Sequence, residues 1–372
     1  MKRTVPDITR RDFLTATAAG VTSPGIALAG KTSDTTRKSA VLHATDLFRP
    51  PNDPDDHWDL ACLYALARRG DIDLKGILID YPPNDGAPDV MAVAQMNFIT
   101  GLAAPVIVGS PPPLKPHSDG APSAGQSDSA RMVLDVLRQY TRPVVINITG
   151  CCRDIAAAAK AAPRLFAEKC AAIYLNAGAG TRDKALASKL EFNVSLDPPA
   201  YAAIFDLPCP VYWMPCFEQV QSPWVVREFG TYYRFRQDEI LAHLSDKMQN
   251  YFAYALGKIN NANWLQYLTG SKDERLLAEH GGNYRNMWCT GGFLHAAGKT
   301  VSRSGEIILL DSEGASPVFT FDPIKVRCSD NGVTEWGTDD KSKGRYIFHV
   351  RDVENYESAM TAAMKSLLMS LP

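Results

Sequence analysis

Residues 40–66 read AVLHATDLFRPPNDPDDHWDLACLYAL, and this stretch decides the fold. The short, mostly apolar run over residues 40–45 predicts a buried strand. Three prolines exclude a helix from the loop at residues 46–54. A helical pattern then begins at Asp55 and Asp56, which suit the positive end of a helix. A strand, an irregular loop and a helix in this order predict the first unit of an α/β fold.

The same alternation continues along the chain. Further strands are predicted over residues 74–80, 105–109, 143–149, 171–175 and 211–214, and helices over residues 91–102, 129–140, 153–161 and 199–205. Residues 223–280 are mainly helical, and residues 307–350 alternate as antiparallel strands do before a last helix over 356–371. We therefore expect an α/β fold with an open, mostly parallel Rossmann-like sheet and helices on both of its faces.

Composition is that of an ordinary globular protein. Of the 372 residues, 45% are hydrophobic and 22% are charged, which is enough to bury a large core. No internal repeat or linker divides residues 40–372, so we expect one domain there. The formal net charge is −2, and basic runs are lacking beyond the N-terminal tail. A nucleic-acid partner is therefore not expected; the oligomeric state stays open, a homo-oligomer included.

The first thirty residues have the order of a twin-arginine export signal. Arg10 and Arg11 stand ahead of a modestly apolar run that ends in Ala27-Leu28-Ala29, a small-x-small cleavage pattern. The alternative is a frayed amphipathic helix. The apolar run is too short for a permanent span, so we expect no stable membrane insertion. The signal predicts a removable peptide over residues 1–29, a linker over 30–39, and a periplasmic or secreted mature chain.

The cysteines show neither zinc spacing nor paired CxxC units. They are scattered, and small buried hydrophobic residues are what such cysteines usually are. Proteins exported by the twin-arginine route fold first in the reducing cytosol, so no disulfide framework is expected. The one pair whose spacing invites a check is Cys209 with Cys216.

Polar residues stand where several predicted strands end. Asp46 closes the first strand, and Asn84 follows the second. Thr149 ends the fourth strand and Asn176 the fifth. In open parallel sheets, ligands bind in the crevice beyond the carboxyl ends of the strands. We therefore expect these residues to share one site.

Aspartates crowd the connection between the first strand and the first helix. Asp46, Asp55 and Asp56 would bring three carboxylates together, with Asp53 as a fourth candidate. Like charges this close repel and raise at least one pKa. A hard divalent cation such as calcium, which takes six to eight oxygen ligands, resolves the conflict. The alternative is that Asp55 and Asp56 only cap the helix.

Three blocks of sequence resemble the inosine–uridine nucleoside hydrolase family. The residues ATD at 44–46, DD at 55–56 and LACL at 60–63 resemble the aspartate-rich N-terminal motif, although the family's aspartates stand closer together. The block ITGCCRDIA at 148–156 is similar to the family's Thr-Gly loop. The block LEFNVSLDP at 190–198 is very like its Glu-Phe-Asn segment. With the strands over 326–337, the resemblance covers most of residues 40–350.

The resemblance implies hydrolysis of the N-glycosidic bond of a ribonucleoside or a related riboside, with Ca²⁺ as the cofactor. Asp46 would ligate the cation and act as the general base that takes a proton from a calcium-bound water. Asp56 and the backbone carbonyl of Thr149 would be further ligands. The substrate would be a small nucleoside or riboside, whose anomeric carbon gains positive charge during cleavage.

The resemblance also implies a set of sugar-binding residues. Asp55 would hold the ribose hydroxyl groups, and Glu191 and Asn193 would hydrogen-bond the sugar. Asn84 is carried over to the same task. Asn176 stands where the family tends to have methionine, and its position at a strand end makes it a candidate as well.

The chain departs from the family near its C-terminal third. There the family supplies a His-Asp pair, the His near the leaving base and the Asp binding cation and sugar. His295 is the nearest candidate, but no Asp follows it. Alternatively, the block NMWCT at 286–290 occupies that part of the site, and His295 faces the core. An asparagine expected about six residues before Glu191 is also replaced, by Ala185.

Two functions from different classes remain. The first is a nucleoside hydrolase with an altered leaving-group pocket. The second is a non-catalytic exported protein that binds a cation or a sugar on the same fold. Retention of Asp46, Asp55 and Asp56 favours the enzyme, because a pure binder needs no water-activating carboxylates. Loss of the late Asp favours the binder.

Overall fold

The structure is a computed structural model that describes residues 38–51, 53–82, 86–111, 127–220, 222–314 and 316–372. Residues 38–372 form one compact unit. The predicted signal peptide, most of the predicted linker, and Asn84 lie outside the described residues. None of the helices over the described ranges combines the length and the apolar character of a membrane span.

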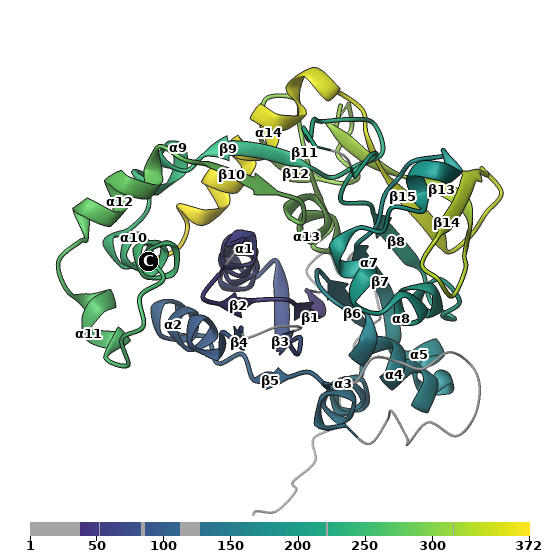
Figure 1. Ribbon diagram of the computed structural model, residues 1–372, viewed down its shortest axis with the longest axis horizontal. Helices are drawn as coiled ribbons and strands as arrows, with labels where there is room; N and C mark the ends of the chain where they lie inside the picture. The colour runs from purple at the N-terminus through teal and green to yellow at the C-terminus, as the bar shows by residue number, and fades with distance from the viewer. Residues whose placement is uncertain (1–37, 52, 83–85, 112–126, 221, 315) are drawn as a thin grey trace, which may run out of the picture. The chain divides into compact units, whose positions relative to one another are not determined.

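A nine-stranded sheet runs through the described unit in the order β14-β13-β15-β8-β7-β6-β1-β3-β5 (Figure 1). Its strands are β1 (Ser39–Thr45), β3 (Ile72–Ile79), β5 (Val106–Val108), β6 (Val144–Ile148), β7 (Cys170–Asn176), β8 (Val211–Met214), β13 (Phe319–Cys328), β14 (Thr334–Thr338) and β15 (Arg345–Val350). Neighbouring strands from β15 to β5 are parallel, whereas β13 is antiparallel to both of its neighbours. The predicted open, mostly parallel sheet is confirmed.

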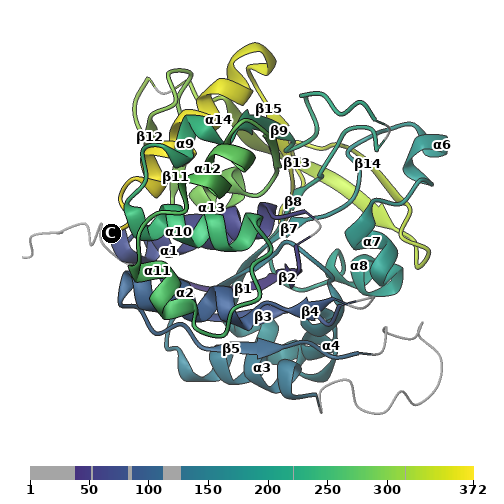
Figure 2. The same cartoon turned by 60° about the vertical axis from the view of Figure 1, so that its left-hand side comes forward.

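Helices cover both faces of this sheet, as predicted (Figure 1, Figure 2). One core packs α1 (Asp55–Arg69), α2 (Val90–Thr100), α10 (Asp246–Leu256), α13 (Thr290–Ala296) and α14 (Val353–Leu368). The other packs α3 (Asp128–Gln139), α4 (Arg153–Ala161), α5 (Pro163–Lys169) and α8 (Pro198–Ile204). Strand β1 serves both cores, because Val41 points into the first, and Leu42 and Ala44 into the second.

Smaller elements complete the described unit. The short helices are α6 (Lys184–Ala187), α7 (Phe192–Leu196), α9 (Asp238–Leu241), α11 (Trp264–Thr269) and α12 (Glu274–Gly281). Three two-stranded sheets pair β2 (Phe48–Arg49) with β4 (Ala87–Pro88), β9 (Tyr233–Arg236) with β10 (Tyr284–Met287), and β11 (Lys299–Val301) with β12 (Ile307–Leu309). Strand β2 follows β1 and β4 follows β3, so this pair borders the carboxyl end of the sheet.

The C-terminal half adds two features to the predicted pattern. Residues 223–280, predicted to be mainly helical, also contain β9, which pairs with β10. The strands over 307–350 are not all antiparallel, because β15 joins β8 in parallel. Alternation of apolar and polar residues predicts a strand but carries no information about the direction of its neighbour.

The thiol contacts differ from the pair that the sequence suggested, Cys209 with Cys216. Cys209 and Cys216 form no disulfide, and the Cys209 thiol interacts with that of Cys170 at the start of β7. Cys216 instead donates a hydrogen bond to Asn176, with 3.6 Å between Sγ and Oδ1. All eight cysteines are free thiols, and all but Cys328 are buried.

Candidate active site at the carboxyl edge of the sheet

A cavity of about 470 Å³ opens beyond the carboxyl ends of β1, β6 and β7. Seven residues that the sequence singled out line it together: Asp46, Asp55, Asp56, Thr149, Asn176, Glu191 and Asn193. Asn84 lies outside the described residues, although its neighbours Pro82 and Gly86 line the same cavity. The rule that ligand sites form at this edge therefore located the cavity correctly.

The carboxylates come from the loop after β1 and from the first turn of α1. Asp46 directly follows β1, while Asp55 and Asp56 open α1, whose N-cap position is occupied by Pro54 without a capping side chain. The buried Asp56 accepts a hydrogen bond from Thr45, with 2.5 Å between Oγ1 and Oδ1. This bond ties the start of the helix to the end of the strand.

The three carboxylates raise one another's pKa values. Burial raises the pKa of Asp46 well above its usual value, and the charges of Asp80 and Asp55 raise it further. The pKa values of Asp55 and Asp56 are also raised, first by burial and then by the charges of neighbouring aspartates. No lysine, arginine or histidine stands among the described residues that line the cavity. This arrangement favours either protons or a metal cation at the site.

Asp53, the fourth candidate, differs from the other three. Its side chain is exposed and forms an ion pair with Arg285, with 2.5 Å between Oδ1 and Nη2. The carboxylate therefore already has a counter-charge. It lines the rim of the cavity without needing a cation.

The Thr-Gly block at residues 148–156 places Thr149 and Gly150 against the aspartates. Thr149 follows β6, and its amide nitrogen donates to the carbonyl of Ala44 at 2.9 Å. A Cβ atom on Gly150 would lie 2.7 Å from the amide nitrogen of Asp46 and closer still to the carboxylate of Asp80. Glycine is therefore required here by close approach.

The third block supplies Glu191 and Asn193. Glu191 caps α7, and its carboxylate accepts from the amide nitrogens of Gly178 and Asn193, both at 2.9 Å. Asn193 donates through Nδ2 to the carbonyl of Thr149 at 3.1 Å. Its Oδ1 is buried without a partner among the described residues. This oxygen is an available acceptor for a ligand hydroxyl group.

An ion pair joins the second block to the third. Arg153, at the start of α4, contacts the buried carboxylate of Asp197, with 3.1 Å between Nε and Oδ2. Arg153 also donates to the carbonyls of Ser110 and Leu196. Asp197 in turn caps α8. The similarity in the two blocks therefore includes residues that fix the loops around the cavity.

Asn176 forms hydrogen bonds within the protein through both ends of its side-chain amide. Its Nδ2 donates to the carbonyl of Met214 at 2.9 Å and to the hydroxyl of Thr231 at 3.0 Å. Its Oδ1 accepts from the thiols of Cys289 and Cys216, at 3.2 and 3.6 Å. With both ends of the amide engaged, Asn176 forms part of the wall, and its predicted contact with the sugar finds no free hydrogen-bonding group.

The prediction that placed His295 in the site is corrected by its position. His295 lies on α13, and its Nδ1 is 2.7 Å from the hydroxyl of Tyr174. Its ring packs against Tyr212 and Phe321, and burial lowers its pKa to about 4. It does not line the cavity. His295 therefore faces the core, which is the alternative that the sequence left open.

The block at 286–290 occupies that side of the cavity instead. Trp288 lines the cavity, and the Cys289 thiol contacts the carboxylate of the fully buried Asp59 as well as Asn176. Burial raises the pKa of Asp59 to about 7. The block at 286–290 contains no carboxylate, so it supplies none to the cavity.

Aromatic side chains form the remaining wall. Phe217 stacks on Trp224 with 4.7 Å between ring centroids, and Trp288 meets both rings edge-on at 5.7 and 6.1 Å. Phe48 and Phe192 also line the cavity. Phe217 and Trp224 were not expected from the sequence, since single aromatic residues in loops carry no periodic signal. Asp80, buried directly after β3, was missed although it is the last residue of a predicted strand.

The donor set fits a hard cation only in part. Asp46 and Asp56 offer carboxylate oxygens and Thr149 a carbonyl oxygen, which are the ligand types that calcium prefers. Across the described residues, however, no three His, Cys, Asp or Glu side chains converge as a ready-made metal site. A cation would therefore have two carboxylate ligands beside the carbonyl, with water completing its shell.

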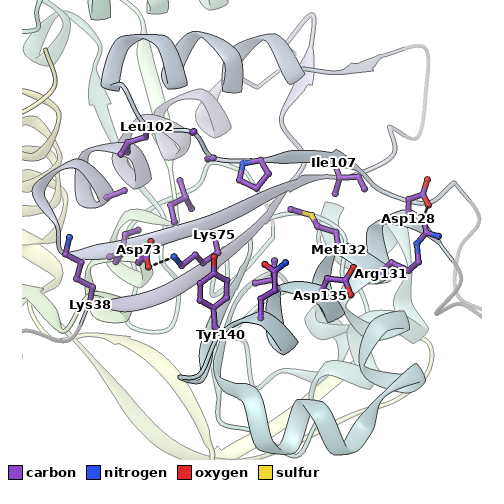
Figure 3. A pocket seen from close by; sticks show the side chains of 18 residues that line it. Lys38, Asp73, Lys75, Leu102, Ile107, Asp128, Arg131, Met132, Asp135 and Tyr140 are labelled. Atoms are coloured by element: carbon purple, nitrogen blue, oxygen red, sulfur yellow. Dashed lines mark hydrogen bonds and ion pairs between the residues drawn. The ribbon is translucent and has the colours of Figure 1, made fainter. Parts of the chain in front are cut away.

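A larger cavity, of about 780 Å³, lies elsewhere on the described unit (Figure 3). It borders the amino end of β3, away from the strand ends that carry the predicted residues. Several of its charged side chains are paired: Lys75 pairs with Asp73 and lies 4.2 Å from the ring centroid of Tyr140. Arg131 likewise pairs with Asp128. Size alone therefore does not identify the site, and the smaller cavity is the candidate.

Comparisons with known proteins bear on the family and the fold of the chain. A family model described as inosine-uridine preferring nucleoside hydrolase matches residues 52–271. No curated protein is matched by the sequence. A plant nucleoside hydrolase structure is similar over 90% of this chain and 99% of its own, with 15% identity and a TM-score of 0.54. A purine-preferring ribonucleoside hydrolase structure from Gardnerella vaginalis is similar over 89% of this chain and 99% of its own. The sequence identity is 17% and the TM-score is 0.50.

At these identities the two structures show a shared fold and no more. The family model carries the assignment, because it extends over more than half of the 372 residues and includes α1, Thr149 and the block from Leu190 to Pro198. The chain therefore belongs to the inosine-uridine preferring nucleoside hydrolase family.

Proposed function

We propose that this chain hydrolyses the N-glycosidic bond of ribonucleosides or related ribosides, with Ca²⁺ as its cofactor. One observation carries the proposal: Asp46, Asp55 and Asp56 meet Thr149, Glu191 and Asn193 in a single cavity at the carboxyl edge of the sheet. Family membership supplies the reaction class. The cluster of carboxylates without a cationic partner supports the cofactor.

Each group in the cavity has a chemical task in this proposal. A bound calcium ion would neutralise carboxylate charge and lower the pKa of a water molecule. Asp46 accepts the proton of the attacking water, because it is half-buried and faces the cavity. Asp55 and the free Oδ1 of Asn193 accept hydrogen bonds from ribose hydroxyl groups. Negative charge near the sugar stabilises the positive charge that develops on the anomeric carbon.

The test is release of free ribose. Purified protein is incubated with a panel of nucleosides, with calcium and with a chelator, and reducing sugar is measured. We expect calcium-dependent ribose release that Asp46→Asn removes. Asp311→Asn serves as the matched control, because Asp311 is exposed and outside the cavity.

A second function is suggested by the block at 286–290, which contains Cys289 and no carboxylate. If a carboxylate is lacking where the family supplies one, the site could bind a cation and a sugar without catalysis. In that case the unaltered protein releases no ribose from any nucleoside, yet ribose raises its melting temperature in calcium. That pair of results would replace the hydrolase with the exported binding protein.

We also propose that the chain is exported through the twin-arginine route. Arg10 and Arg11 precede an apolar run and a small-x-small site, which supports this address. Changing both arginines to lysine should keep the precursor in the cytoplasm, as judged by fractionation and by the mass of the mature N-terminus. Normal export of the double variant would contradict the proposal.

A further inference from the structure

The cavity has an unusual combination of walls for a riboside. Five of the described lining residues are carboxylates, Asp46, Asp53, Asp55, Asp56 and Glu191, and none is cationic. Arg285 offsets the charge of Asp53, and a divalent cation offsets at most two of the other four. The field inside the cavity therefore favours a positively charged ligand, because low-dielectric walls focus it.

The aromatic wall is suited to the same kind of ligand. Phe217, Trp224 and Trp288 contact one another and line one cavity. Aromatic rings attract cations through their quadrupole, and tryptophan does so best. A flat cationic ring would gain stacking and a cation–π interaction at once.

The aromatic side also offers no acid for a leaving group. The indole N–H of Trp288 can donate a hydrogen bond but does not transfer a proton. The thiol of Cys216 is engaged with Asn176, and His295 lies in the core. Among the described lining residues, the remaining acids are Asp53, which is paired with Arg285, and the carboxylates assigned to cation and sugar. A neutral nucleobase that leaves as an anion is therefore not protonated from this side.

We propose that the cavity selects ribosides whose heteroaromatic leaving group is positively charged, such as pyridinium ribosides. This rests on the proposed hydrolase function. Water adds to the anomeric carbon as the bond from that carbon to the ring nitrogen breaks, and the bonding electron pair stays on nitrogen. The ring leaves as a neutral heterocycle, so no acid is needed. The proton of water passes to Asp46 and then to solvent, and the products are ribose, heterocycle and one proton.

The experiment compares charged and neutral leaving groups. Full-length protein with saturating calcium is assayed for kcat/KM on nicotinamide riboside, inosine and uridine, and each value is divided by the rate without enzyme. This division removes the greater intrinsic lability of the pyridinium riboside. We expect the cationic riboside to exceed both neutral ones by about ten-fold or more. Equal or higher values for the neutral nucleosides would overturn the inference and leave the hydrolase intact.

Variants assign the preference to the aromatic wall. Trp288→Leu should reduce the cationic preference roughly ten-fold, whereas Trp288→Phe should retain most of it. Trp264→Leu is the matched control, because Trp264 packs on Phe98 outside the cavity. Melting curves establish that each variant is folded. A preference that survives in a folded Trp288→Leu protein would also overturn the inference.

A binding measurement separates this inference from the proposed function. Asp46→Asn protein in calcium is titrated with nicotinamide riboside and with its neutral dihydro form. If no riboside is hydrolysed by the parent but the cationic form binds about ten-fold more tightly, the hydrolase fails and the selectivity stands. If both forms bind equally, the selectivity fails whatever the outcome for hydrolysis.

Discussion

The acidic and the aromatic sides of the cavity are built in different ways. Asp46 and Thr149 stand at the ends of sheet strands, and Asp56 is hydrogen-bonded to Thr45 of β1. The sheet therefore fixes the acidic side. Phe217, Trp224 and Trp288 come from segments after β8 and β10, and they pack on one another and on Tyr232. We therefore expect that the aromatic side can change without disturbing the carboxylates. Leaving-group preference and reaction chemistry would then be separable.

The largest expected effect is on the acidic side. Asp46→Asn keeps the shape of the side chain but cannot accept a proton. We expect kcat to fall about a hundred- to ten-thousand-fold at saturating calcium, while riboside binding changes less. The measurement is turnover of the best riboside in the panel. A parent-like rate for this variant would move the general base elsewhere and break the assignment of chemistry to this side.

Calcium binding should depend on Asp56 and far less on Asp53. At a calcium concentration one hundred times its Kd, the folded state gains about 2.7 kcal/mol, which raises the melting temperature. Asp56→Ala should abolish this shift. Asp53→Ala is the control on the same loop, because Asp53 is exposed and already paired with Arg285. Equal effects of the two variants would mean that loop charge, and no specific site, attracts the cation.

The effect of calcium should also depend on pH. The pKa values of Asp46, Asp55 and Asp56 are raised in the calcium-free folded state. The folded state thus holds protons that the unfolded state has lost, and its stability falls as pH rises above the usual carboxyl value of 3.8. The change is about 1.4 kcal/mol for each pH unit and each proton.

Calcium replaces these protons, so its stabilising effect should be larger at pH 7 than at pH 5. Melting curves at both values, with calcium and with a chelator, provide the measurement. A calcium effect that decreases from pH 5 to pH 7 would show that the carboxylates do not titrate as their burial predicts.

The smallest effect is expected on the aromatic side. Trp224→Ala removes a ring that stacks on Phe217 and should weaken riboside binding by about 1 kcal/mol, or roughly five-fold. The calcium shift of the melting temperature should stay as in the parent. Isothermal titration with the riboside and with calcium measures both quantities. Loss of the calcium shift in a folded Trp224→Ala protein would show that the two sides are coupled after all.

Much of the fold followed from pattern. Strands β1 and β8 and helices α1 and α4 were predicted within a few residues, because each combines a clear period with a clear boundary. The β9 and β10 pair was missed, since a four-residue strand within a helical region has too little periodicity to detect. The parallel pairing of β15 with β8 was missed because strand direction is a tertiary property.

The site was predictable where it depends on strand ends. Asp46 and Thr149 were placed by that rule, and Glu191 and Asn193 by the resemblance. His295 was misplaced, because its helix turns the ring toward Tyr174 and the core. Trp224 could not be found, since only the packing of distant loops brings it to the cavity. Asp80 carried the same strand-end signal as Asp46, and the rule applied fully would have found it.

The position of β15 has a consequence for synthesis. Arg345–Val350 is translated after the other eight strands of the described sheet, yet β15 lies inside that sheet between β8 and β13. Helix α14, translated after β15, packs against α1. A nascent chain that lacks both elements therefore exposes the open edge of β8 and an uncovered core face, both prone to aggregation. A premature stop after residue 340 would remove the strand that joins β13 and β14 to the rest of the sheet.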